Sequence, residues 1–332
     1  MISTRQINRN ISVDILKFIG ILCVILAHVS PPEIVHGLRS FDVCMLVYAS
    51  GITLKYRKYT LNTYLEYLWH RVKRLIIPSY IFIVIYAVIC TLVGTIWNEN
   101  WLNPISYYIK SFSLIGGGIG YLWIMAVYFL LAIVSPLIGW ISEKPNLKKY
   151  ALYCILALLF LNEIMAISIE HYIKLEIVAN LLKVGLIYTM GYAIVEISAK
   201  FSGSLKLVNY GALLVVFMLL WWISGFTDLQ NYKYPPQALY LLYGILVSAV
   251  IYQFSEMYLS PKLKKDEFCH FRRIISWFSV NSLDIYFAHI IVLKICGKDG
   301  FNIQNWGTKY IVVVSCSALL VLLMNIVKTR KR

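Results

Sequence analysis

Residues 11–30, ISVDILKFIGILCVILAHVS, decide the fold, because this stretch is long and apolar enough to cross a bilayer as a helix. The stretch also carries three ionisable residues, Asp14, Lys17 and His28. A charged side chain at the centre of a membrane helix costs about 2.5–3.5 kcal/mol on insertion scales, so such residues are rare and usually functional. The stretch therefore predicts a membrane helix that takes part in function rather than a plain anchor.

The spacing of these residues assigns them to different places on the helix. Ten residues separate Lys17 from His28, which puts the two side chains on one face but about 16 Å apart along the axis. Imidazole takes and gives protons near neutral pH, so His28 suits a general base; the alternative is a buried histidine that hydrogen-bonds a neighbouring helix. Asp14 and Lys17, at i and i+3, either help to bind an anionic donor or neutralise each other near the cytoplasmic interface.

The composition of the whole chain is that of a polytopic membrane protein. Of its 332 residues, 60% are hydrophobic and only 14% are charged, whereas roughly a quarter of the residues in a soluble domain are charged. The net charge is +15. Because most basic residues fall in short loops between apolar runs, we attribute this charge to topology and anionic lipid headgroups and expect no nucleic-acid partner. The seven cysteines form no C-x-x-C pair, so we expect neither a metal site nor a disulfide framework.

The apolar runs predict an all-α bundle of about ten transmembrane helices. The expected spans are residues 11–30, 38–54, 75–97, 119–141, 149–168, 178–197, 207–225, 236–257, 274–296 and 309–327. Lysine and arginine gather in alternate loops, which favours both termini in the cytoplasm. We interpret the first run as a retained signal-anchor and expect one transmembrane domain over residues 1–332, with no appended soluble domain.

Two further groups of residues are candidates for function. Arg71, Lys73 and Arg74 precede the third expected span; three positive charges within about one turn bind phosphates well, although the topology rule explains them equally well. His289 lies within the ninth expected span and is a candidate by the same membrane argument as His28. The other histidines are expected to be solvated in loops or at interfaces: His36, His70, His171 and His270.

Several segments, taken together and in order, resemble the acyltransferase-3 family of integral membrane proteins. VDILKFIGILCVILAH resembles the opening of the family, with Lys17 where the family has an arginine ten residues before its histidine. FDVCMLVYASG resembles its second span, and YLWHRVKRLIIPSYIF resembles its third, with an Arg-x-x-Arg motif at Arg71 and Arg74. YLWIMAVYFLLAIVSPLI resembles its fourth helix, and NSLDIYFAHIIVLKI a late helix that carries Tyr286 and His289.

The resemblance implies an O-acetyltransferase of the cell envelope, located in a bacterial plasma membrane. Acetyl-CoA would be the donor, and a hydroxyl of a cell-surface polysaccharide or its lipid-linked precursor the acceptor. His28 would be the catalytic base. Lys17 and Asp14 would belong with His28 to the catalytic group. Binding of acyl-CoA is assigned to Arg71, Lys73 and Arg74, and binding of the acceptor to His289, Tyr286 and Trp123.

Two other classes of protein remain open at this stage. A transporter or flippase of polysaccharide units would also have about ten spans, intramembrane charges and aromatic surfaces, but the sequence shows no related halves of the kind that transporters often have. A sensory or scaffolding membrane protein would not need His28 or Lys17.

Overall fold

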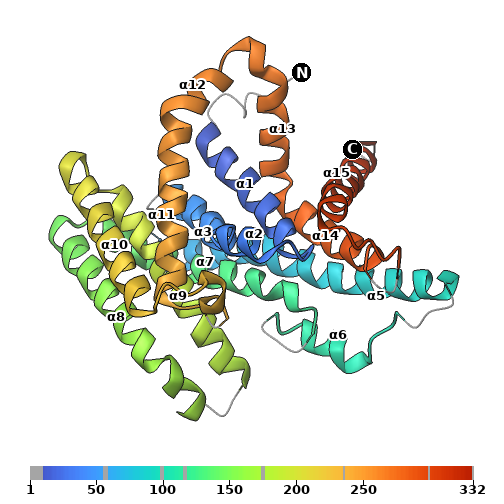
Figure 1. Cartoon of the computed structure of the whole chain (residues 1–332), viewed down its shortest axis with the longest axis horizontal. Coiled ribbons are helices and arrows are strands. Elements are labelled where there is room, and N and C mark those ends of the chain that lie inside the picture. The colour runs from blue at the N-terminus through green and yellow to red at the C-terminus, as the bar shows by residue number, and fades with distance from the viewer. Residues whose placement is uncertain are drawn as a thin grey trace. The chain divides into compact units, whose positions relative to one another are not determined.

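The computed structural model describes residues 10–54, 59–97, 101–114, 118–172, 176–234, 236–297 and 300–330, with residues 160–172, 176–184 and 329–330 described by their backbone alone. The described chain is helical and contains no β-strand, only one isolated bridge between Lys233 and Pro236 (Figure 1). The helices group into two compact units. Unit 1 combines Met1–Ala49 with Gly244–Arg332, and unit 2 is Ser50–Tyr243.

Unit 1 holds both ends of the chain. Its helices, in order, are α1 (Ile11–Ala27), α2 (Glu33–Leu38), most of α3 (Asp42–Ile52) and of α11 (Ala238–Phe254), a π-helical turn (Ser255–Leu259), α12 (Ser260–Leu263), a 3-10 turn (Asp266–Phe268), α13 (Cys269–Val280), α14 (Ser282–Ile295) and α15 (Trp306–Arg330). Helix α1 packs against α13, α14 and α15, which places the first expected span inside this unit.

Unit 2 is built around α7. Its helices are α4 (Leu61–Arg71), a π-helical turn (Val72–Ile76), α5 (Ile77–Trp97), α6 (Ile105–Ser111), a 3-10 turn (Gly120–Leu122), α7 (Trp123–Ser142), α8 (Pro145–Tyr172), α9 (Glu176–Ala199), α10 (Gly203–Ile223) and a 3-10 turn (Leu229–Tyr232). Helix α7 contacts α9 most extensively and also packs against α4, α8 and the turn at Val72–Ile76.

Small residues let the helices of unit 1 approach one another closely. A Cβ added at Gly20 of α1 would meet Leu46 Cδ2 of α3 at 2.7 Å. One added at Gly244 of α11 would overlap the side chain of Cys44 in α3. In a bilayer, helices associate through such close backbone packing because burial of apolar surface gives no driving force against lipid. Helices α1, α3 and α11 therefore form a tight set.

Five helical segments of the described chain are long and apolar enough to cross a membrane, and a bent pair raises the number to six. The five are Leu61–Trp97, Gly120–Ser142, Gly203–Ile223, Ala238–Leu263 and Trp306–Lys328. The prediction of an apolar helical bundle is confirmed, while the finer prediction of about ten spans goes beyond these segments. The expected single span at 274–296 is instead two helices, α13 and α14, bent by 76°.

Asn281 occupies the break between α13 and α14. Its backbone N–H and its Nδ2 both donate to the carbonyl of Trp277, at 3.0 and 2.8 Å, and so end α13. Its Oδ1 accepts from Asn325 Nδ2 of α15 at 2.9 Å. The hydropathy pattern of residues 274–296 carries no sign of this break, because the two helices together remain apolar enough to pass as one span.

Candidate functional site

His28 lies where α1 ends. Its backbone N–H still donates to Ile25 O at 3.0 Å, but the chain then leaves the helix, with Ser30 at a φ of 58° and two prolines after it. Proline disfavours helical conformation in the residue before it. The imidazole, expected within a longer span, is therefore half-buried at the helix terminus rather than enclosed in the middle of a helix.

A second histidine packs against the first. The rings of His28 and His289 are stacked, with centroids 5.7 Å apart and planes 24° from parallel. His289 belongs to α14 and is fully buried, and the ring of Tyr286 meets it edge-on at 5.0 Å. The structure thus brings together three residues that the sequence predicted separately: His28, His289 and Tyr286.

The hydrogen bond of His289 assigns its tautomer. Its Nδ1 lies against the carbonyl oxygen of Tyr286, and because a carbonyl only accepts, Nδ1 is the donor. In the neutral ring the acceptor lone pair is then on Nε2. His28 therefore has a ring of fixed orientation beside it.

Asp14 lies at the other end of α1. Its carboxylate is buried and accepts hydrogen bonds from Ser279 Oγ at 2.7 Å and Ser276 Oγ at 3.1 Å, both in α13. Asn10 caps the same helix end, its Oδ1 accepting from the backbone N–H of Ser12 at 2.9 Å. Asp14 is about 21 Å from His28 along the helix axis, so it fixes α1 to α13 and does not reach the imidazole.

Lys17 lies one turn beyond Asp14 and is half-buried. It remains about 16 Å from His28 along the axis, as its spacing predicted. The structure therefore divides the three ionisable residues of α1 into Asp14 and Lys17 at the start of the helix and His28 at its end.

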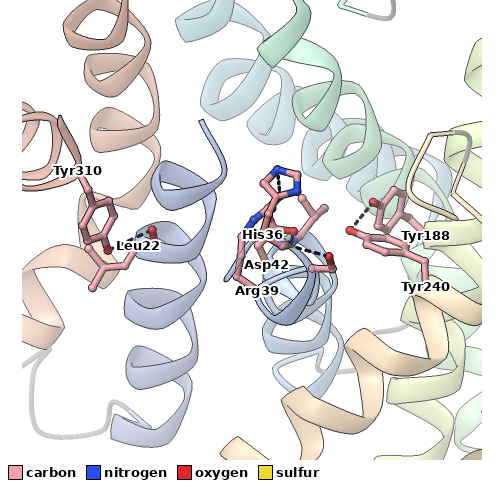
Figure 2. A network of polar contacts seen from close by, with 9 residues as sticks. Leu22, His36, Arg39, Asp42, Tyr188, Tyr240 and Tyr310 are labelled. Atoms are coloured by element: carbon pink, nitrogen blue, oxygen red, sulfur yellow. Dashed lines mark hydrogen bonds and ion pairs between the residues drawn. The ribbon is translucent and has the colours of Figure 1, made fainter. Parts of the chain in front are cut away.

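The loop after α1 contains a polar cluster that the sequence reading missed (Figure 2). Arg39 Nη1 contacts Asp42 Oδ2 at 2.7 Å, and both side chains are almost fully buried. Arg39 Nη2 also contacts His36 Nε2 at 2.6 Å. His36, expected to be solvated, is half-buried, with its Nε2 on this buried guanidinium. The i, i+3 spacing of His36, Arg39 and Asp42 was the available signal.

The basic residues of unit 2 point in different directions. The guanidinium of Arg71 lies over the ring of Tyr67 at 5.0 Å and is half-buried. Lys73 is exposed, with its Nζ over the ring of Trp69 at 5.3 Å, and Arg74 is also exposed. Arg71 ends α4, and Lys73 and Arg74 lie in the π-helical turn at Val72–Ile76 that follows it. Such turns appear mostly as single bulges in α-helices, frequently at functional sites.

Trp123 begins α7 and belongs to an aromatic cluster within unit 2. Its ring lies 5.7 Å from that of Tyr188 and 6.0 Å from that of Tyr234. Tyr188 Oη donates to Tyr240 Oη at 3.3 Å (Figure 2). Lys233 is buried with its Nζ 5.6 Å from the Tyr234 ring. Only Trp123 of this group was predicted as a site residue.

The described residues contain no group of three or more histidine, cysteine or acidic side chains placed to hold a metal ion.

Comparison with known proteins places the chain among the acyltransferases. A family model described as an acyltransferase domain matches residues 10–330, which is nearly the whole chain and includes all the residues described above. The chain belongs to the acyltransferase-3 family. This membership confirms the predicted resemblance and, with the apolar helices, identifies a membrane acyltransferase. No curated protein and no solved structure matches the chain.

Proposed function

We propose that this acyltransferase-3 protein is an O-acetyltransferase that moves an acetyl group from cytoplasmic acetyl-CoA to a hydroxyl of a cell-surface polysaccharide or its lipid-linked precursor. The observation that carries the proposal is the half-buried His28 imidazole at the end of α1, stacked on the buried ring of His289. A general base has to reach the acceptor hydroxyl and also hold a defined orientation. The helix terminus gives His28 access, and the stacked ring supports its orientation.

The proposed reaction begins when a ring nitrogen of His28 takes the proton of the acceptor hydroxyl. The hydroxyl oxygen then forms a bond to the carbonyl carbon of the thioester, and the bond from that carbon to sulfur breaks. The departing thiolate takes the proton back from the imidazolium. The products are an O-acetyl ester and free CoA thiol, so atoms and protons balance, and His28 returns to its starting state.

His289 acts in this proposal through His28. Since its ring is fully buried, it positions the base and does not touch donor or acceptor. Tyr286 fixes the His289 ring in two ways: its own ring meets that ring edge-on, and its backbone carbonyl accepts the hydrogen bond from Nδ1. Asp14, tied to α13, sets the start of the helix that ends at His28. Tyr286 and Trp123 remain proposed contacts for the acceptor, and Lys17 a proposed charge on the path of the donor.

The donor would bind on the cytoplasmic side at Arg71, Lys73 and Arg74, which supply cationic groups for the phosphates of acetyl-CoA. This arrangement requires the proposed topology of about ten spans with both termini in the cytoplasm of a bacterial cell. Positive residues at the cytoplasmic ends of spans support that topology.

The test is acetyl transfer from radiolabelled acetyl-CoA in membranes that contain the wild-type protein, His28→Ala or His270→Ala. His270 is an exposed histidine of α13 and serves as the matched control. We expect labelled glycan with the wild type and with His270→Ala but none with His28→Ala, at equal amounts of protein in the membrane. Undiminished labelling with His28→Ala would contradict the assignment of the base.

A transporter or flippase is the second candidate, and the break of 76° between α13 and α14 is the observation that favours it. Transporters often place their substrate at discontinuous helices. If no acetyl is transferred and glycan accumulates on one membrane face of a deletion strain, the transporter replaces the acetyltransferase.

A further inference from the structure

The guanidinium of Arg71 lies over Tyr67, one of three clustered tyrosines, and this group has no role in the chemistry at His28. Tyr59, Tyr64 and Tyr67 form one aromatic surface before and along α4. Their ring centroids are 5.4 Å apart for Tyr59–Tyr67, 6.2 Å for Tyr59–Tyr64 and 6.5 Å for Tyr64–Tyr67. Each ring is half-buried, so part of this surface is accessible.

Helix α7 fixes two of these rings. Tyr64 Oη donates to Ile133 O at 2.9 Å, and Tyr67 Oη lies 3.0 Å from Ser135 Oγ. Tyr192 of α9 is also within electrostatic range of Arg71, Tyr67 and Tyr59. The aromatic surface is therefore attached to the central helices of unit 2, and the rings are already ordered before any ligand binds.

The position of Arg71 suits an anionic ligand with a planar part. One face of the guanidinium packs on Tyr67, which leaves the N–H groups at its edge able to donate in the plane. A planar guanidinium donates in this way to phosphate oxygens, often through two parallel bonds. The nearby charges of Lys73 and Arg74 are exposed and add to the positive potential. A base stacked on tyrosine is worth about 1–3 kcal/mol, whatever the base.

We infer that Tyr59, Tyr64, Tyr67 and Arg71 form the binding site for the adenosine-phosphate end of the donor, with adenine on the tyrosine surface and phosphate on Arg71. This inference rests on the proposed function, because it takes a CoA thioester as the donor. It separates two parts of donor recognition: the nucleotide end binds in unit 2 through aromatic and guanidinium groups, whereas the acyl end has to reach His28.

The test uses 3′,5′-ADP, which carries the adenine and phosphates but no thioester, in equilibrium titrations of the full-length protein in nanodiscs. The wild type is expected to bind it. Tyr64→Leu and Arg71→Ala are each expected to weaken binding about tenfold, as the loss of one stacking or one charge-assisted contact predicts. Tyr64→Phe keeps the ring and is expected to restore affinity to within about threefold of the wild type.

Tyr80→Leu is the matched control. Tyr80 is a partly exposed tyrosine of α5 that packs on Phe112, outside the surface at Arg71. Its replacement is expected to leave 3′,5′-ADP binding unchanged. If the wild type binds no 3′,5′-ADP, or if Tyr64→Leu binds it as tightly as the wild type, the inference is wrong. Pyrophosphate that binds as tightly as 3′,5′-ADP would likewise overturn the role of the tyrosines and leave a simple anion site.

Kinetics separate this inference from the proposed function. With acetyl-pantetheine, which lacks the nucleotide, Tyr64→Leu is expected to transfer acetyl as well as the wild type does, while its KM for acetyl-CoA rises about tenfold. Binding of 3′,5′-ADP without acetyl transfer from either donor would contradict the acetyltransferase and support the nucleotide site. Acetyl transfer by a protein that does not bind 3′,5′-ADP would support the acetyltransferase and contradict the nucleotide site.

Discussion

Two ion pairs of this protein have the same length and opposite surroundings. Arg39–Asp42 in unit 1 and Lys200–Glu143 in unit 2 both measure 2.7 Å, but the first pair has side-chain exposures of 3% and 2%, and the second 33% and 46%. Unit 1 also buries Asp14 and His289, whereas Lys73 and Arg74 of unit 2 are exposed. The difference separates two tasks. In the proposed function, the buried His289 ring next to His28 suits proton transfer, while the exposed charges of unit 2 suit capture of an anionic donor from water.

The largest expected effect tests that division directly through kinetics. His28→Ala is expected to lower kcat about 10²–10⁴-fold, the usual contribution of a general base. Arg74→Ala, at an exposed charge of unit 2, is expected to raise the KM for acetyl-CoA several-fold with little change in kcat. Steady-state assays on membranes with matched protein content measure both. The division between the units fails if the two variants change the same kinetic parameter.

The buried ion pair of unit 1 is expected to control stability. Arg39→Ala leaves the Asp42 carboxylate buried without its guanidinium, which costs about 3–5 kcal/mol. Thermal unfolding in detergent should therefore show a large fall in melting temperature. The double variant Arg39→Met with Asp42→Leu removes both charges and should recover most of that loss. A melting temperature for Arg39→Ala equal to that of the wild type would show that this cluster is accessible to water.

The two ends of α1 are expected to differ in the same way, with Asp14 affecting stability and His28 affecting catalysis. Asp14→Ala leaves the hydroxyls of Ser276 and Ser279 without their shared acceptor and is expected to cost about 1–3 kcal/mol of stability. At a temperature where the variant stays folded, kcat should be close to that of the wild type, because Asp14 is about 21 Å from His28. Asp14→Asn keeps an acceptor and should lose less. A lower kcat with an unchanged melting temperature would instead place Asp14 in the chemistry.

The exposed pair of unit 2 is expected to matter least. Lys200→Met should cost about 0–1 kcal/mol, the range for solvent-exposed pairs. The hydrogen bond to Glu143 raises the pKa of Lys200 above its ordinary value. Its contribution is therefore fully present below the unfolded pKa of about 10.4 and is lost as pH rises through the higher folded pKa. Melting curves of wild type and Lys200→Met should differ slightly at pH 8 and converge well above pH 10; a growing difference at high pH would contradict the pairing.

Sequence reasoning identified α1 and placed its ionisable residues at either end, but it did not identify the contacts around them. The spacing of Lys17 and His28 predicted that they are too far apart to touch, and the helical geometry of α1 agrees. The pairing of His28 with His289 was not predictable, because it depends on the break at Asn281 that turns α14 against the end of α1. The burial of Arg39 was not predicted either, because its i, i+3 spacing to Asp42 indicates an ion pair but not that the pair is enclosed.

The sequence by itself determined the membrane class, the helical fold and the acyltransferase-3 family, because these depend on composition, apolar run length and local motifs. Only the tertiary structure decided which polar groups meet. It placed His289 behind His28, and Ser276 and Ser279 on Asp14. The physical reason is that a hydrogen bond or ring contact acts over a few ångströms, whereas the residues that form it are brought together by helix packing over hundreds of positions.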